Sequence, residues 1–231
     1  MAVVPDPAHL ARISLFQNLT HPELTKLHGM LHIMTLAAGS GVMTVEQPGE
    51  VAYVILEGTV KIHIEQLDGT EVILAILGPG EILGEMSLVD ALGRSASVAT
   101  MEATTLLWLD RSTFWGCLRE MPTMTYNLVG ILSRRLRLAN AHIQVLAALD
   151  VDGRIAHQLL AFAQTYGEPA VNDTVRIPLR LTQVDIAALV GASRVRVNQV
   201  LGTYRRLKYI SVDAQHRITI LDRAALIQLG Q

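Results

Sequence analysis

The chain has 231 residues, half of them apolar and 17% charged, which fits one large or two ordinary domains and argues against disorder. No apolar run reaches the roughly 18 residues that span a bilayer, and the N-terminus lacks the basic flank and apolar stretch of a secretory signal. The single cysteine, Cys117, excludes an intramolecular disulfide and a four-cysteine cluster from one chain. We therefore expect a cytoplasmic protein with no membrane partner.

The charge is unevenly distributed along the chain. Residues 1–146 carry 9 basic and 14 acidic side chains, whereas residues 147–231 carry 10 basic and 7 acidic ones. The segment 174–223 alone carries 9 basic and 3 acidic side chains. A basic block of this kind is typical of a nucleic-acid interface, although charge alone fits a solvated surface better.

Short helices are expected over residues 8–32 and strands from about 33 to 110. Thr20, Pro22 and Glu23 have the spacing of a helix start, with the threonine as N-cap. Asp68-Gly69 between two apolar runs predicts a hairpin. The regular spacing of short strands indicates an antiparallel barrel or roll. The expected strands are Val42–Val45, Ala52–Leu56, Thr59–Glu65, Thr70–Leu77 and Ser97–Leu109.

Helical patterning follows from residue 112 to 149. We expect Ser112 to cap a short helix that ends near Pro122, and Thr123 to begin a long one. Apolar residues on the long helix recur at alternating spacings of 3 and 4. This seam favours a two-helix dimer contact over a helix that only covers its own domain. The seam residues are Val129, Leu132, Leu136, Ala139, Ile143 and Leu146.

The C-terminal region predicts a winged helix-turn-helix. A loop is expected at Gly167–Asp173 and a short strand at Val175–Leu179. A hairpin is expected from Tyr209–Val212 and Arg217–Leu221. The expected helices are Val151–Thr165, Thr182–Val190 and Ser193–Leu207, with Thr182 and Ser193 as N-caps.

The second helix of this motif has the features of a recognition helix. Gly191 is suited to the positive φ of a helix end, while Val197, Val200 and Leu201 face inward. Polar side chains remain on the outward, N-terminal part, where such helices meet base edges. They are Arg194, Arg196 and Gln199, and phosphate contacts are expected from Arg205, Arg206, Lys208 and Arg217. The alternative is an ordinary helical hairpin with a charged surface.

The segment Gly80–Val98 carries a candidate phosphate site. Gly84 allows close approach of backbone to a ligand, and Met86–Val89 can form one helical turn. Arg94 offers a cationic fork, Ser95 adds a hydroxyl donor, and Glu85 can accept from a sugar hydroxyl. An Arg94–Glu85 salt bridge in a plain β-roll is an equally good explanation of the same residues.

These motifs resemble those of the CRP/FNR family of dimeric bacterial transcription regulators over nearly the whole chain. Gly84–Ala96 resembles the family's phosphate-binding cassette, and Arg134-Arg135-Leu136 its dimer helix. Leu149–Ala156 resembles its hinge and Thr182–Leu201 its helix-turn-helix.

The resemblance implies an α+β chain of three parts. A cyclic-nucleotide-binding, jelly-roll-like β-roll would occupy residues 1–122, a dimerisation helix and hinge residues 123–149, and a winged helix-turn-helix residues 150–231. The implied function is transcription regulation by a homodimer on a near-palindromic operator in double-stranded DNA. Cyclic AMP or a related nucleotide would act as the allosteric effector, with no tightly bound cofactor, and RNA polymerase would be a partner. The alternatives are a ligand-independent regulator with a vestigial pocket and a cyclic-nucleotide-binding regulatory subunit.

The resemblance also implies residue roles at the nucleotide. Glu85 would take the ribose 2′-hydroxyl, and Arg135 would face Glu85 and the base. Arg94 and Ser95 would hold the phosphate, with the N–H groups of Gly84 and Ala96 nearby. The two adenine-reaching positions of the dimer helix fall at Ala139 and Asn140, so one hydroxyl is lost here. Loss of one neutral hydrogen bond is worth roughly 0.5–1.5 kcal/mol, which weakens base selection rather than phosphate binding.

The recognition helix departs from the pattern of the cyclic-AMP receptors. Arg194 matches the guanine-reading arginine, but the next position is Val195 where the receptors have an acid, and Gln199 stands where they have arginine. Valine can contact a thymine methyl but cannot accept from cytosine. We therefore expect a half-site that keeps one G and differs around it.

Other chemistries lack their residues. An FNR-type iron–sulfur sensor needs several cysteines. His28, His32 and His63 are single histidines of the kind more often found as surface or core residues than as haem ligands. No nucleophile–base constellation stands out, so neither an enzyme nor a metal site is expected.

Overall fold

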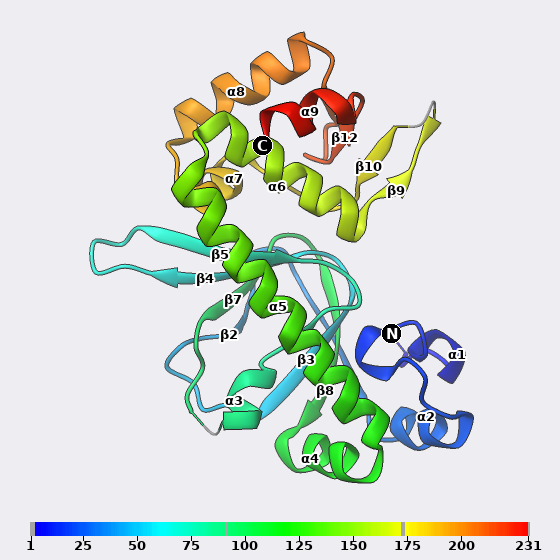
Figure 1. Ribbon diagram of the computed structural model, residues 1–231. Coiled ribbons are helices and arrows are strands. Elements are labelled where there is room, and N and C mark those ends of the chain that lie inside the picture. The colour runs from blue at the N-terminus through cyan, green and yellow to red at the C-terminus, as the bar shows by residue number, and fades with distance from the viewer. Residues whose placement is uncertain (1–2, 91, 172–173, 231) are drawn as a thin grey trace. The chain divides into compact units, whose positions relative to one another are not determined.

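The computed structural model describes residues 3–90, 92–171 and 174–230, and the chain divides into two compact units (Figure 1). The first comprises Met1–Ile64 and Ala75–Leu138, and the second comprises Glu65–Leu74 and Ala139–Gln231. The long helix α5, Pro122–Ala148, contributes residues to both. Within the described residues, no helix is both long and apolar enough to cross a membrane.

The N-terminal part is the expected antiparallel β-roll of two four-stranded sheets, ordered β1-β8-β3-β6 and β2-β7-β4-β5. Val54 pairs with Leu107 in one sheet and Ile62 with Val98 in the other. The strands are β1 His32–Leu36, β2 Gly41–Met43, β3 Val51–Glu57, β4 Val60–Glu65, β5 Glu71–Leu77, β6 Ile82–Leu83, β7 Ser97–Thr100 and β8 Thr104–Asp110. Strands β1 and β6 were not among the expected ones.

The prediction of one strand over Ser97–Leu109 is wrong, because the segment forms β7 in one sheet and β8 in the other. The chain changes sheets at residues 101–103, where the Met101 N–H still donates to the Thr59 carbonyl at 2.8 Å and two side-chain bonds are added. Thr59 Oγ1 donates to Glu102 Oε1 at 2.6 Å, and Thr104 Oγ1 donates to the Glu102 carbonyl at 2.9 Å. Gly58 lies against Thr104, where a Cβ would clash with its side chain and backbone.

Short helices flank the roll. They are α1 Pro7–Leu10, the 3₁₀ turn Ser14–Phe16, α2 His21–His28, α3 Glu85–Asp90 and α4 Arg111–Glu120. The expected capping box of Thr20 and Glu23 is confirmed at the start of α2. Ser112 does not cap α4, because the N-cap is Asp110, whose carboxylate accepts the Thr113 N–H at 2.9 Å. Ser112 lies inside the first turn and donates to the same carboxylate.

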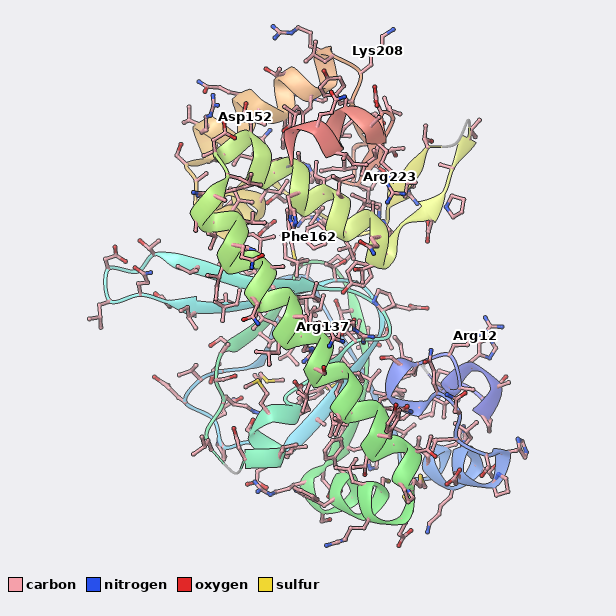
Figure 2. All side chains as sticks on the ribbon, viewed as in Figure 1. Arg12, Arg137, Asp152, Phe162, Lys208 and Arg223 are labelled. Atoms are coloured by element: carbon pink, nitrogen blue, oxygen red, sulfur yellow. The ribbon has the colours of Figure 1, made fainter. Side chains whose placement is uncertain are left out.

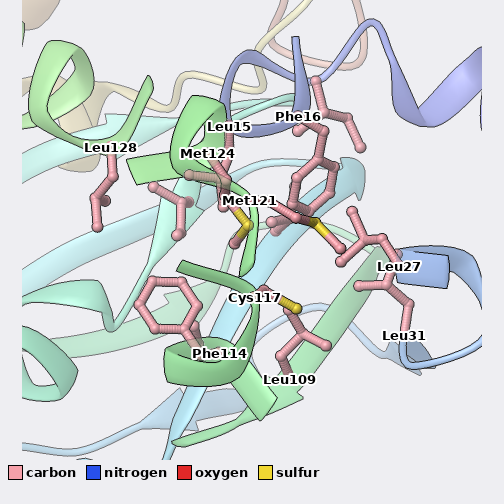
Figure 3. Close-up of a cluster of buried hydrophobic side chains, with 14 of the residues drawn as sticks. Leu15, Phe16, Leu27, Leu31, Leu109, Phe114, Cys117, Met121, Met124 and Leu128 are labelled. Atoms are coloured by element: carbon pink, nitrogen blue, oxygen red, sulfur yellow. The ribbon is translucent and has the colours of Figure 1, made fainter. Parts of the chain in front are cut away.

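The core of the roll joins these helices to the sheets (Figure 3). Phe16 and Phe114 are fully buried, and Cys117 lies beside them in the same cluster. Burial raises the pKa of the Cys117 thiol. Met124, Leu128 and Ile131 of α5 are buried in this core.

The opposite face of α5 carries the expected seam. Leu136 and Ile143 are each 64% exposed, and Val129 is also exposed. Leu132 differs, because it packs against the core cluster of its own domain. In the single chain, one face of α5 packs on the core of its own domain. A second, apolar face is exposed to solvent, as the predicted dimer contact requires.

The C-terminal part is the expected winged helix-turn-helix. Its sheet has the order β11-β12-β10-β9. The elements are α6 Val151–Tyr166, β9 Glu168–Pro169, β10 Val175–Ile177, α7 Gln183–Val190, α8 Arg194–Arg206, β11 Ile210–Val212, β12 Ile218–Ile220 and α9 Arg223–Leu229. The segment Gly167–Asp173 is not wholly a loop, because β9 within it pairs with β10. Asn172 and Asp173 lie outside the described residues. Helix α9 was not expected.

Candidate anion site and nucleic-acid interface

Gly84 shapes the first candidate site. Its φ is +77°, a left-handed conformation that favours glycine. A Cβ here would lie 2.4 Å from Arg94 Nη1 and 2.9 Å from the Val51 carbonyl oxygen. The expected helical turn after it is present as α3. Ala91, within the cassette Gly84–Ala96, lies outside the described residues.

Arg94 is buried at the centre of this site, with 7% of its surface exposed. Nη1 donates to the Gly84 carbonyl at 2.9 Å and to Ser87 Oγ at 3.1 Å, and Nη2 donates to the Val51 carbonyl at 2.8 Å. Its Nε is buried with no hydrogen-bond partner among the described residues. Burial lowers the pKa of Arg94, and a buried cation with an unsatisfied donor is suited to an anion.

Glu85 is 2% exposed, and its partner is Arg135 rather than Arg94. Arg135 Nη1 donates to Glu85 Oε1 at 2.5 Å, while Nη2 donates to the Ile82 carbonyl at 2.5 Å and to Glu81 Oε2 at 3.2 Å. The arginine thereby links α5 to the segment in which β6 ends and α3 begins. The expected proximity of Arg135 and Glu85 is confirmed, and no Arg94–Glu85 ion pair is present among the described residues.

The remaining cassette residues differ in exposure. Ser95 is exposed, with Oγ 3.9 Å from Met86 Sδ, whereas Ala96 is buried. Asn140 and Ala139 are exposed on α5 and belong to the second compact unit, so their role at a nucleotide stays a prediction.

Sequence reasoning missed Val51 and Ser87 as partners of Arg94, and Glu81 as a partner of Arg135. Val51 contributes only a backbone carbonyl, which leaves no signal in the sequence. Ser87 lies three residues after Gly84, and this short spacing could have suggested that its hydroxyl belongs to the same site as the glycine. No group of three or more His, Cys, Asp or Glu side chains is placed for a metal within residues 3–90, 92–171 and 174–230.

The helix-turn-helix is built by its caps as expected. Thr182 accepts from the Asp185 N–H in a capping box, and Ser193 accepts from the Arg196 N–H at 3.2 Å. Gly191 ends α7 at φ +64°. Buried Val197, Val200 and Leu201 hold α8 against the domain core, which confirms their expected inward position.

The face of α8 that points away from the domain core is exposed to solvent. Arg194, Val195 and Gln199 are exposed, so the three expected base-reading positions share a solvent face. Arg205 and Arg206 are exposed at its C-terminal end. Lys208 is exposed two residues beyond that end (Figure 2). Arg196 differs, because its Nη2 donates to Asp152 Oδ1 at 2.5 Å. Arg217 is half-buried in the wing and donates through Nε to the Pro178 carbonyl at 2.8 Å.

Two domain families match the two parts of this architecture. The cyclic nucleotide-binding domain family matches residues 33–121, and the Crp-like helix-turn-helix domain family matches residues 153–229. These ranges include the candidate anion site on the roll and the exposed face of α8.

Similar proteins match over most of the chain. A CRP-like cAMP-activated global transcriptional regulator of Mycobacterium tuberculosis is 34% identical over 89% of this chain and 92% of its own length. A cyclic AMP receptor protein of Thermus thermophilus is 36% identical over 66% of this chain and 67% of its own length. The structure of FixK2 from Bradyrhizobium japonicum covers 87% of this chain and 98% of its own length, with a TM-score of 0.76 and 19% identity, which shows a shared fold. The chain belongs to the CRP/FNR family of transcriptional regulators.

Proposed function

We propose that this chain is a sequence-specific DNA-binding regulator controlled by cyclic AMP or a related nucleotide, with cyclic AMP as the first choice. The observation that carries the nucleotide assignment is the buried Arg94 beside the close backbone of Gly84, because its Nε has no hydrogen-bond partner in the part of the chain that the structure describes. Relatives described as cAMP-activated support this choice of effector. Cyclic GMP and other nucleotides are the competing ligands. Ligand-independent regulation is the less favoured alternative.

The nucleotide would bind through its phosphate and ribose. Arg94 and Ser95 would hold the cyclic phosphate, aided by the N–H groups of Gly84 and Ala96. Glu85, already oriented by Arg135, would accept from the ribose 2′-hydroxyl. Asn140 would supply the polar contact to the base. The residues Gly84, Glu85, Arg94 and Arg135 fit this role because hydrogen bonds already join them in two pairs, Arg94 with Gly84 and Arg135 with Glu85.

On DNA, α8 would enter the major groove. Arg194 would contact guanine O6 and N7, Val195 a thymine methyl, and Gln199 adenine N6 and N7. Thr182, Ser193, Arg205 and Arg217 would lie along the phosphates, the first two through the helix N-termini that they cap. Arg196 would lie at the DNA surface on the outward side of α8, where Asp152 is its partner in the free protein. A homodimer would place two such helices about one DNA turn (~34 Å) apart on a near-palindrome.

Coupling would run through the long helix. A nucleotide that contacts both the roll and α5 would bias the seam from Leu132 to Leu146 and rotate the C-terminal domains about Asp150. An effect of ~1–3 kcal/mol is ordinary for such coupling. We also propose a contact with RNA polymerase, a cytoplasmic location and no enzymatic activity, on the basis of the family.

Calorimetric titration of the purified protein with cyclic AMP, with cyclic GMP as comparison, tests the effector. We expect cyclic AMP to bind at micromolar concentration or tighter, and cyclic GMP to bind more weakly. Absence of heat with both, from folded protein free of carried-over ligand, would remove these two effectors and leave only the DNA-binding assignment.

A further inference from the structure

Asp152 and Arg196 form an ion pair that links the start of α6 to the recognition helix. Asp152 Oδ1 accepts from Arg196 Nη2 at 2.5 Å, and the two side chains are 35% and 48% exposed. Figure 2 shows Asp152 at the start of α6, beside α8. The pair lies at the surface and is accessible to solvent, so another anion can compete for the arginine.

A second hydrogen bond links α8 to the backbone of Asp152. The hydroxyl of Tyr204, a buried residue of α8, donates to the Asp152 carbonyl oxygen at 2.8 Å. Burial raises the pKa of this hydroxyl, and the charges of Asp152 and Asp150 raise it further. The tyrosine therefore remains a neutral donor that links α6 to α8 beside the Asp152–Arg196 ion pair.

Arg196 is the third residue of α8, next to the exposed Val195 and one turn before Gln199. The N-terminal part of a recognition helix lies nearest to DNA, where an arginine is attracted to phosphate oxygens. The Asp152 carboxylate accepts a hydrogen bond from one nitrogen of that guanidinium and offsets its charge at short range.

We propose that Asp152 is an affinity-tuning residue that withholds Arg196 from the DNA phosphates and so lowers sequence-independent binding. The inference rests on the proposed DNA-binding function of α8. A regulator that binds random DNA more weakly is less occupied by non-operator sites. Asp152 lies two residues after Asp150, about which the C-terminal domain is proposed to rotate, so the ion pair belongs to the segment that the proposed effector response would move.

The test compares the wild type with Asp152→Asn on a fluorescein-labelled, random-sequence duplex of about 30 base pairs, by fluorescence anisotropy at a series of salt concentrations. Asparagine keeps the shape of the side chain but removes the charge. We expect the variant to bind about two- to fivefold more tightly per recognition helix, the range covered by half-exposed ion pairs. The salt slope should steepen by about 0.9 for each additional phosphate contact, a change that a purely structural role would not produce.

Two controls separate the pair from general charge effects. Asp222→Asn makes the same charge change in the same domain, at an N-cap that forms no ion pair within the described part of the chain, and it should leave the slope unchanged. In an Arg196→Gln background, Asp152→Asn should have little effect. Equal gains from Asp152→Asn with and without Arg196, or a gain no larger than that of Asp222→Asn, would overturn the inference while DNA binding itself stands. Failure of the wild type to bind the duplex even at low salt would overturn the proposed function as well.

Discussion

Arg94 makes three hydrogen bonds to the roll and still retains a buried Nε donor that no other described residue satisfies. The sequence suggested two uses for this arginine, a phosphate site or a salt bridge with Glu85. The structure gives the two residues different partners, because Glu85 forms its ion pair with Arg135. The Arg94 guanidinium therefore forms no ion pair with Glu85, and this keeps its charge available to an anion.

Arg94→Ala should weaken cyclic AMP binding by about 10- to 100-fold, because a hydrogen bond to a charged group is worth roughly 1.5–3 kcal/mol. Calorimetry measures this change directly. Arg94→Lys, which keeps a charge but loses the fork, should lose less affinity, and thermal unfolding shows whether either variant remains folded. Unchanged affinity in folded Arg94→Ala protein would refute the site.

Arg194→Ala should relax sequence preference at a single base pair of the operator by about 1–3 kcal/mol. The measurement is the affinity for the operator and for each single-base-pair variant of it. Arg205→Ala is the matched control, since loss of a phosphate contact weakens binding to every sequence alike. If Arg194→Ala behaves like Arg205→Ala, Arg194 contacts only phosphate.

Asp110 provides a test of the corrected cap of α4. Hydrogen bonds from Thr113 and Ser112 lower its pKa from 3.8 to about 2. A depressed carboxyl pKa means that its stabilisation is present above about pH 4 and is lost as the pH falls through about 2. Asp110→Ala should lower the free energy of unfolding of the N-terminal domain by about 0.5–2 kcal/mol at neutral pH, measured by urea denaturation. Ser112→Ala should cost less, and the reverse order would restore Ser112 as the cap.

At the scale of elements, features that depend on neighbouring residues could be predicted from the sequence. Features that depend on contacts between distant parts of the chain could not. The helices of the helix-turn-helix were predictable because Thr182, Gly191 and Ser193 mark their ends by residue type alone. The division of Ser97–Leu109 into two strands was not, because it depends on Thr59, a residue far away in the sequence. The same holds for the candidate anion site, where the carbonyl of Val51 on β3 accepts a hydrogen bond from Arg94, far away in the sequence.

The seam of α5 carries the dimer prediction. Leu136→Glu combined with Ile143→Glu should convert a dimer to a monomer, because charges would enter an apolar two-helix contact. Sedimentation velocity measures the change. Leu138→Glu is the matched control, since Leu138 is equally an exposed leucine of α5 but lies off the seam, and this variant should remain dimeric. A dimer that survives the double substitution would place the interface elsewhere.

At the scale of the whole molecule, an acidic N-terminal part and a basic C-terminal part are joined in one chain of small net charge. The formal net charge is only −2, yet the C-terminal block is strongly basic. Overall charge therefore gave no indication of DNA binding, whereas its distribution did. The order of the four motifs along the chain was sufficient to identify the family, because each motif was recognisable from its residues.

The most direct test of the account measures operator affinity with and without cyclic AMP, on the duplex that the wild-type protein selects from a randomised pool. The account predicts that cyclic AMP tightens binding by about 5- to 150-fold, the range of a typical coupling free energy, and that Arg94→Ala abolishes this gain. Equal affinity in the presence and absence of cyclic AMP, in protein that binds the nucleotide, would contradict allosteric control of DNA binding.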